Sequence, residues 1–546
     1  MSLKKNLTLK KIFFLLIACL AQLFFLRNLC AQDLSGAELS DAISARLRRQ
    51  GLNPEKKPLS TAWYEEFPYN IELNFSASEE SEWTMILAVA QEDAWRNEEF
   101  IFGLLNDLPK IYLPCNIKVV LTASDENKIA GNEKMAGSEI CAKNIEGAQN
   151  FAALVLDFAD TRKNFVTPGT DKEISPYHLT RHLCDSLSAN SIPFEISGGV
   201  FLALYRLGAL KSATRLDSFL NKEIPSVMAT FSTKSPNPSA QSGAIKDFFS
   251  SLNSAAFSEW SRHYIPVKFN SKFYWLQERT ILLNIFSFTA VILFVLADFA
   301  FLFKRRSRIL VYIKTMALLS NYLIAVTAAL LTAAFFLGQY FAKAFESVGI
   351  HNPMILFILK LVPAFLLVSM IYPLELLRHK KISTYIYEYI LSVSAALNLF
   401  IFTFVDISFF YLFALEYIIF TISRLFKRSA FLFVFIILFT LPFLPLIYSI
   451  LIYSSPQKIH SLVFCGLGEN ILLSFMLVPF NLLWLRILAR MNIKAPTIKN
   501  LFFRYGIAGF SVIALLAAFS AGTIYIMEKL FFKNIEFSQR SLQIRE

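Results

Sequence analysis

Apolar residues are distributed differently in the two halves of the chain. In the first half they occur in short runs separated by polar residues, whereas eight long apolar segments follow one another from about residue 280. Most of these segments approach or exceed the roughly 20 residues that a membrane-spanning helix needs. They cover about 280–303, 315–338, 353–376, 382–402, 407–424, 429–453, 461–485 and 505–528. The pattern predicts an all-α membrane domain of about eight helices in residues 279–530, with one helix boundary near Asp406.

Residues 32–278 have the alternating pattern of a folded α/β domain. Strands are predicted at Asn70–Ser76, Thr84–Ala90, Ile117–Thr122, Phe151–Asp157 and Ser226–Phe231. Helical spacing occurs at Glu98–Asn106, Pro176–Ala189, Gly198–Leu210 and Ala240–Leu252. Strands that alternate with helices predict an α/β sandwich with a mixed, mostly parallel sheet. The first two strands are close in sequence, and we expect them to form an antiparallel hairpin at one edge.

The first 31 residues have the pattern of a signal peptide or an uncleaved signal anchor. Four lysines precede the apolar run from Ile12 to Leu26, which is short for a span. If residues 32–278 lie outside the cytoplasm, the basic loops between the apolar segments all fall on the cytoplasmic side, as expected of membrane proteins. Residues 531–546 then form an extracytoplasmic tail. We expect a bacterial inner membrane with residues 32–278 in the periplasm, or alternatively an endomembrane with this domain in the lumen.

Composition supports a membrane protein and argues against other classes. Of the 546 residues, 55% are hydrophobic and 17% charged, which is too apolar for a protein that is soluble throughout. The net charge of +12 suggests nucleic acid binding, but the basic residues cluster at the ends of apolar segments, so we expect the lipid bilayer and no nucleic acid as a partner. The six cysteines form no CxxC pattern, which argues against a disulfide scaffold.

Three predicted strands end in acidic residues. Gln91, Glu92 and Asp93 follow the second strand, Asp125 and Glu126 follow the third, and Asp157 ends the fourth. Because sites collect at the carboxyl ends of strands in α/β sheets, these side chains are candidates for binding, acid–base chemistry or a metal. Acidic residues that only terminate strands and cap helices would give the same pattern.

The order of these elements resembles the zinc aminopeptidase family. The resemblance covers about residues 69–235 and rests on the strand-end carboxylates, Gly137-Ser138 and the later Ile224-Pro225-Ser226. It implies a general base at Asp125 and, if a metal is present, ligands at Asp93, Glu126 and Asp157.

The chain departs from that family where the metal would bind. Gln91 stands in place of the first histidine ligand, and residues 232–235 offer no final histidine. His178 and His182 share one helical face, which is more typical of a solvated helix than of a zinc site. Zinc prefers imidazole and thiolate ligands, so we expect no bound metal and no cofactor, or zinc if the domain is active after all.

A degenerate aminopeptidase-like domain joined to a multi-span bundle is similar to the Gaa-type subunits of the GPI-anchor transamidase. It is also similar to membrane-bound members of the peptidase family. The Gaa-type resemblance implies that ordinary zinc chemistry is lost and that the domain helps to present a substrate for amide-bond exchange.

Acidic residues inside predicted spans are the candidates in the membrane domain. They are Asp298, Glu388, Glu416 and Glu469, with Asp406 at the helix boundary. Because such residues are costly in lipid, they mark a functional site unless they pair with a basic residue such as Lys360 or Lys314.

Three functions remain open. The first is a non-hydrolytic accessory that binds a peptide, protein or lipid-linked substrate, together with other membrane subunits. The second is an active membrane-bound zinc metallopeptidase, and the third is a transporter or lipid-handling permease.

Overall fold

The chain divides into two compact units in the computed structural model. The first, here called the sheet unit, comprises residues 1–197 and 212–262, and the second, the helical unit, comprises residues 198–211 and 263–546. The structure describes residues 36–59, 69–125, 136–147, 150–210, 214–234, 237–252, 261–269, 272–301, 309–349, 351–366, 384–423, 426, 429–453 and 456–491. The predicted signal segment, Glu126, the eighth apolar segment and the tail 531–546 lie outside these residues.

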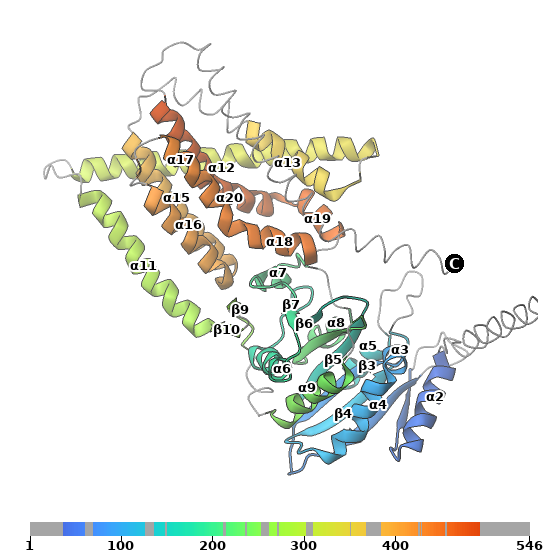
Figure 1. Ribbon diagram of the computed structural model, residues 1–546. Coiled ribbons are helices and arrows are strands. Elements are labelled where there is room, and N and C mark those ends of the chain that lie inside the picture. Colours follow the sequence, from blue (N-terminus) through green and yellow to red (C-terminus); the bar gives the residue numbers. More distant parts are fainter. Residues whose placement is uncertain are drawn as a thin grey trace, which may run out of the picture. The chain divides into compact units, whose positions relative to one another are not determined.

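An eight-stranded sheet forms the centre of the sheet unit (Figure 1). Its strands are β1 (Glu55–Pro58), β2 (Tyr69–Phe75), β3 (Thr84–Ala90), β4 (Asn116–Thr122), β5 (Phe151–Ala159), β6 (Asn164–Thr167), β7 (Phe194–Ile196) and β8 (Ser226–Ser232). Their order is β1-β2-β4-β3-β5-β8-β6-β7. The central strands β4, β3, β5 and β8 run parallel, whereas β1–β2, β2–β4 and β6–β8 pair antiparallel. The predicted mixed, mostly parallel sheet is therefore present.

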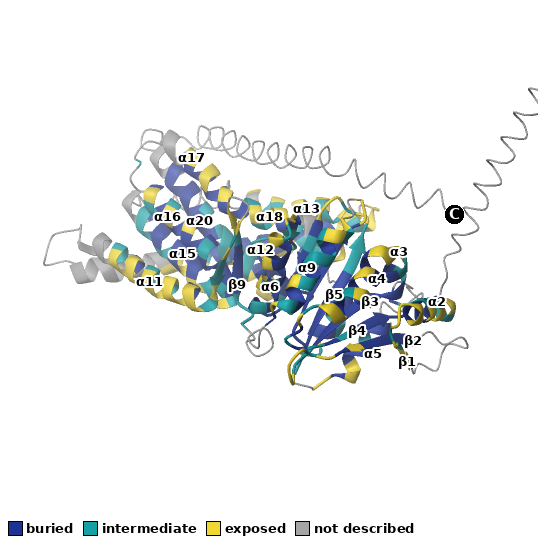
Figure 2. Cartoon of the chain, turned by 60° about the horizontal axis from the view of Figure 1, so that its bottom comes forward, coloured by how far each residue is buried: buried dark blue, intermediate teal, exposed yellow. Residues whose placement is uncertain are grey.

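Helices cover both faces of this sheet because its central strands are apolar on both sides. In β3 every residue after Thr84 is buried (Figure 2). On one face Ile86 and Ala88 pack with residues of α5 (Ala136–Asn144) and α8 (Thr214–Leu220). The other described helices of this unit are α2 (Gly36–Arg49), α3 (Gln91–Arg96), α4 (Glu98–Asp107), η1 (Leu108–Lys110), α6 (Tyr177–Ala189) and α9 (Pro238–Ser250). The cysteines Cys115, Cys141 and Cys184 are buried in this unit.

The expected hairpin between the first two predicted strands is wrong. β4 lies between β2 and β3, so these strands do not pair. The polar connection after β2 instead binds the start of β4, because Asn116 accepts a hydrogen bond from Ala77 N (3.0 Å) and donates to Ser81 O (2.9 Å). The helix predicted at Gly198–Leu210 is also too long, since only α7 (Ala203–Arg206) is helical there.

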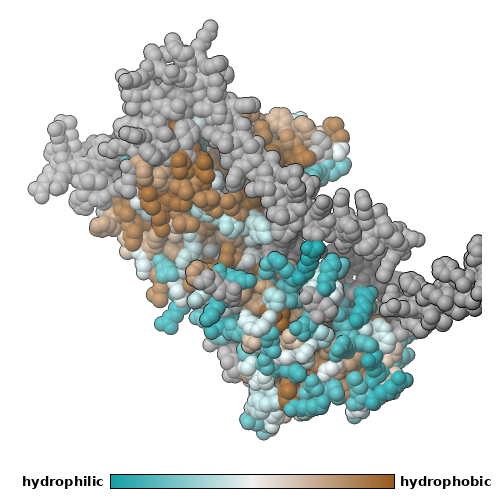
Figure 3. Space-filling view, viewed as in Figure 1, coloured by the Kyte–Doolittle hydropathy of each residue, from teal (hydrophilic) through white to brown (hydrophobic). Residues whose placement is uncertain are grey.

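The helical unit begins, after α7, with a hairpin of β9 (Tyr264–Phe269) and β10 (Lys272–Gln277). Its helices are α11 (Glu278–Phe301), α12 (Ile309–Ser347), α13 (Pro353–Leu366), α15 (Thr384–Val405), η3 (Ile407–Phe409), α16 (Phe410–Ser423), α17 (Ser429–Thr440), η4 (Leu441–Phe443), α18 (Leu444–Tyr453), α19 (Pro456–Val463) and α20 (Leu467–Met491). Four stretches are long and apolar enough to cross a membrane: Glu278–Leu296, Asn321–Ser347, Tyr387–Val405 and Leu467–Ile487. Figure 3 shows hydrophobic residues gathered on the surface of these helices, in contrast to the mostly hydrophilic surface of the sheet unit.

The predicted helix boundary near Asp406 is confirmed. α15 ends at Val405, and the Asp406 carboxylate accepts a hydrogen bond from Ser408 N (2.8 Å), which starts η3. Two predicted segments are more broken than expected. The segment 429–453 is interrupted by η4, where Pro442 lacks the N–H that a continuous helix requires, and 461–485 spans the break between α19 and α20.

Candidate functional site

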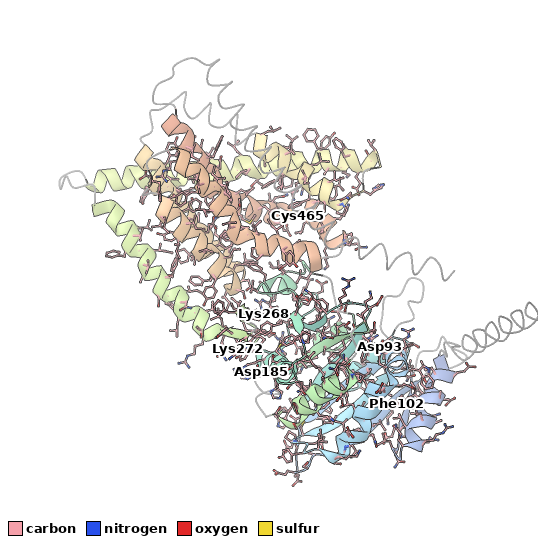
Figure 4. The ribbon with its side chains drawn as sticks, in the orientation of Figure 1. Asp93, Phe102, Asp185, Lys268, Lys272 and Cys465 are labelled. Carbon is pink, nitrogen blue, oxygen red and sulfur yellow. The ribbon has the colours of Figure 1, made fainter. Side chains whose placement is uncertain are left out.

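The carboxyl ends of β4, β3 and β5 bring most of the predicted site residues to one edge of the sheet. In the parallel register Ala90 of β3 lies opposite Thr122 of β4, and Val89 lies opposite Leu156 of β5. Gln91, Glu92 and Asp93 therefore begin α3 at the level where β4 ends and where β5, which continues to Ala159, reaches Asp157. Asp93 is labelled in Figure 4. Asp125 and Asp157 lie at the same edge.

Gln91 is used to hold the sheet together. Its side chain is 1% exposed, and its Nε2 donates to the carbonyl oxygens of Tyr69 (2.8 Å) and Leu121 (3.1 Å). Its Oε1 accepts a hydrogen bond from Ser40 Oγ of α2 (2.7 Å). The amide thus connects α2, β2 and the end of β4, and its one oxygen already accepts a hydrogen bond from Ser40.

Asp125, the predicted general base, accepts hydrogen bonds from neighbouring residues on both carboxylate oxygens. The side chain is 2% exposed, its Oδ2 accepts hydrogen bonds from Thr122 Oγ1 (2.6 Å) and Ser138 Oγ (2.5 Å), and its Oδ1 accepts one from Ser138 N (3.1 Å). The adjacent Gly137 fits only as glycine, because a Cβ there would lie 2.4 Å from the Ala123 carbonyl oxygen. The Gly137-Ser138 pair therefore seats the start of α5 on the end of β4.

Arg215 joins two of the predicted metal-binding carboxylates. Its Nη1 lies 2.6 Å from Asp93 Oδ2, 3.3 Å from Asp157 Oδ1 and 3.4 Å from the Leu156 carbonyl oxygen. The side chains of Arg215 and Asp93 are 9% and 4% exposed, whereas that of Asp157 is 27% exposed. Burial opposes the charged form of the guanidinium, but the charges of Asp93, Asp157 and Asp125 outweigh this and raise the pKa of Arg215 above its ordinary value.

Sequence reasoning missed Arg215. It is the second residue of α8, 58 positions after Asp157, and no motif connects it to the acidic strand ends. The available signal was indirect: two carboxylates directed to one buried edge require a cation, and when a metal is not expected, a basic side chain is the other candidate.

The remaining predicted residues of this edge are less enclosed. Glu92 is half-buried at the start of α3. The Oδ2 of Asp157 accepts a hydrogen bond from Thr230 Oγ1 of β8 (3.4 Å). Glu126 lies outside the described residues.

A zinc ion does not fit this set of side chains. The two carboxylates that would bind it already bind a guanidinium, Asp125 accepts hydrogen bonds on both oxygens, and Gln91 holds backbone carbonyls. His182 of α6 instead lies 3.1 Å through its Nε2 from the Phe248 carbonyl oxygen, and burial lowers its pKa. Among the described residues, no three His, Cys, Asp or Glu side chains form a group that could hold a metal ion.

The acidic candidates of the helical unit have different surroundings. Glu388 accepts a hydrogen bond from Arg486 Nη2 (2.9 Å), and Asp406 binds Arg206 of α7 through both carboxylate oxygens (2.5 and 2.7 Å). Glu416 is completely buried, whereas Glu469 is exposed at the start of α20. Asp298 lies in α11, and its side chain is not among those described.

The basic partners differ from those expected. The Nζ of Lys360 lies 2.9 Å from both the Leu462 carbonyl oxygen and Cys465 Sγ, so this lysine does not pair with an acidic candidate. Arg486 follows the predicted segment 461–485, which places it in the next basic loop, but it is fully buried within α20.

Comparison with known proteins gives distant structural relatives and one family. Among solved structures, the chain is similar to the LapA aminopeptidase of Legionella pneumophila (12% identity, 39% of this chain and 64% of that chain, TM-score 0.29). It is also similar to a Zn-dependent exopeptidase of Parabacteroides distasonis (9% identity, 40% and 88%, TM-score 0.26) and to a glutaminyl cyclase of Fimbriiglobus ruber (10% identity, 39% and 86%, TM-score 0.30). At these TM-scores none of the likenesses bears on the activity of this chain. No curated protein matches the sequence.

Two family models match successive parts of the chain. Residues 52–276 match the first domain of the TP_0564 family, and residues 321–525 match its second domain. Together the two matches cover more than half of the 546 residues and identify the chain as a two-domain member of the TP_0564 family.

Proposed function

We propose that this protein is a polytopic membrane protein whose sheet unit is a zinc-free, non-hydrolytic binding accessory. The observation that supports this most directly is the position of Arg215 between Asp93 and Asp157. In the aminopeptidase-like arrangement suggested by the sequence, a divalent cation would neutralise these carboxylates. Here a side chain of the chain itself supplies the positive charge, so zinc would have to displace a buried ion pair in order to bind.

The proposed role follows the Gaa-type resemblance. The sheet unit would bind a peptide, protein or lipid-linked substrate at the carboxyl ends of its strands, where Glu92 and Asp157 keep some exposure. The apolar helices would hold it at a bilayer, with the sheet unit in the periplasm and other membrane subunits as partners. The test below separates this role from an active metallopeptidase.

The test measures metal content and hydrolysis in the full chain, purified in detergent from zinc-supplemented cells. We expect substoichiometric zinc by mass spectrometry and no chelator-sensitive release of an N-terminal residue from aminoacyl fluorogenic substrates. Asp93→Asn is compared with Asp185→Asn, whose side chain is 61% exposed on α6. One zinc or more per chain, with hydrolysis that is lost in Asp93→Asn and kept in Asp185→Asn, would overturn the proposal and establish the peptidase.

The second candidate function is that of a transporter or lipid-handling permease. It is favoured by one observation, the completely buried Glu416 within apolar helices. Acidic residues in such positions mark ion or substrate pathways by default.

A further inference from the structure

Glu416 is a buried acid for which the described part of the helical unit provides no cation. It lies in the middle of α16 and is 0% exposed, and neither carboxylate oxygen has a hydrogen-bond partner among the described residues. An isolated carboxylate in an apolar interior costs far more free energy than the neutral acid. Such a group therefore requires a bound positive charge, either a proton or another cation.

The other buried charges of these helices already have partners. Arg486 pairs with Glu388 and also donates to Ser423 Oγ (3.1 Å). The Lys360 ammonium donates to the Leu462 carbonyl oxygen. The predicted span 505–528, which lies outside the described residues, contains no Lys or Arg that could pair with Glu416.

Two amide side chains near the same level also lack hydrogen-bond partners among the described residues. Asn398 of α15 is 1% exposed, Asn481 of α20 is 4% exposed, and neither amide nitrogen nor amide oxygen has a hydrogen-bond partner. Asn398 is close enough to the Glu416 carboxyl to interact with it electrostatically, although no hydrogen bond of ordinary geometry joins the two described side chains. Buried polar groups are ordinarily satisfied, so such a group of orphan atoms indicates a ligand or water.

Ring contacts place these residues at nearby levels along the three helices. Phe402 of α15 stacks on Phe413 of α16 with centroids 4.2 Å apart. Phe439 of α17 lies 4.1 Å from Phe420 of α16 and 4.0 Å from Phe480 of α20. Glu416 lies between the two α16 rings, Asn481 follows Phe480, and Asn398 is one turn before Phe402.

We propose that Glu416 binds an exchangeable proton in the interior between α15, α16 and α20. The neutral carboxyl donates its O–H to the amide oxygen of Asn398 or, through water, to that of Asn481. Loss of the proton to water leaves a carboxylate that only the amide N–H groups can stabilise. The protonation state of one residue therefore changes the charge inside the helical unit, which goes beyond the accessory role proposed for the sheet unit and does not depend on it.

Several titratable or charged residues belong to α16 itself or to the elements packed against it. η3, α17 and η4 contribute none within their bounds. The others are Tyr385, Tyr387, Glu388 and Tyr389 on α15, Tyr411 and Tyr417 on α16, Asp406 before η3, Glu278, Arg279 and Asp298 on α11, and Glu469, Arg486 and Arg490 on α20.

The first test compares thermal unfolding of the full chain in detergent for two matched substitutions. Glu416→Gln replaces a neutral acid by a neutral isostere, so we expect a Tm within about 2 °C of that of the unsubstituted protein. Glu388→Gln leaves Arg486 buried without its counter-charge, so we expect a Tm lower by roughly 5 °C or more. An equal loss in both variants would show that Glu416 is ionised and paired, and would overturn the proposal.

The second test needs no variant and therefore does not depend on folding of a mutant. Dicyclohexylcarbodiimide, an apolar reagent that reacts with protonated carboxyls, is added to the unsubstituted full chain, and labelled peptides are measured by mass spectrometry. We expect labelling of Glu416 to exceed that of Glu388 about tenfold and to fall as pH rises. No preference for Glu416 would overturn the proposal, and protection by Na⁺ at constant pH would instead assign the site to a metal cation.

Discussion

Replacing Arg215 by methionine is expected to destabilise the sheet unit strongly. Methionine replaces the aliphatic stem of Arg215 but removes the cation between Asp93 and Asp157. Loss of one partner from a buried pair costs about 3–5 kcal/mol. We expect a value near ~3 kcal/mol, at the lower end, because Asp157 is 27% exposed and water screens part of its charge.

This free energy corresponds to a drop in Tm of about 6–12 °C for a unit of this size. The assay is thermal unfolding of the full chain in detergent, followed by tryptophan fluorescence, which reports on the sheet unit through Trp83 and Trp95 and on the helical unit through Trp275 and Trp484. The control is Lys163→Met, because Lys163 and Glu195 form an exposed pair (57% and 40%) worth less than about 1 kcal/mol. Arg215→Lys should lose less than Arg215→Met, since it keeps the charge but not the planar guanidinium. Equal Tm values for Arg215→Met and Lys163→Met would refute the reasoning.

Three further predictions concern other parts of the chain. A Cβ at Gly338 would lie 2.1 Å from a carbonyl oxygen of α13, so Gly338→Ala should lower the free energy of unfolding of the full chain by about 1–3 kcal/mol, measured as a lower Tm. Gly103→Ala, with no atom within 4 Å of its Cβ, should raise the free energy of unfolding by up to about 1 kcal/mol. No difference in Tm between the two variants would contradict the packing of α12 on α13. Burial lowers the pKa of His182, so below about pH 6.5 the unfolded chain binds a proton that the folded chain does not, and stability should fall as pH decreases from 6.5. His182→Gln should remove this part of the pH dependence, measured as Tm against pH. An unchanged profile would exclude His182 as its source. Iodoacetamide should label the half-exposed Cys465 before the buried cysteines of the sheet unit, since burial raises the pKa of Cys141 to about 12; mass spectrometry showing the reverse order would contradict the burial pattern.

The sequence predicted the centre of the sheet better than its edges. The apolar runs of β3 and β5 pack on both faces, and such runs mark buried parallel strands directly. The wrong hairpin has a different origin, because strand order depends on contacts between distant residues. The side chain of Asn116 binds the connection after β2, and no local sequence pattern predicts that contact.

The acidic residues of the candidate site could be predicted from the sequence, but the arginine that binds them could not. The positions of Asp93, just after β3, and of Asp157, two residues before the end of β5, follow from the apolar runs of these strands, which periodicity indicates. Arg215 reaches them from a helix that begins far along the chain, and Arg486 likewise reaches Glu388 from α20. Ion pairs between distant segments leave no spacing in the sequence, so only the folded chain shows which acid has which partner.

The segment Gly198–Lys211 has a consequence for how this protein can be divided. It interrupts the sheet unit, belongs to the helical unit and is held there by Arg206 on Asp406, so the polypeptide changes unit more than once. A recombinant fragment that stops before the first span would contain Arg206 but not its partner Asp406. The segment just before Arg215 would then lose this attachment. A cut between the two units in sequence therefore cannot separate them cleanly, because each unit contains chain from both sides of Gly198–Lys211.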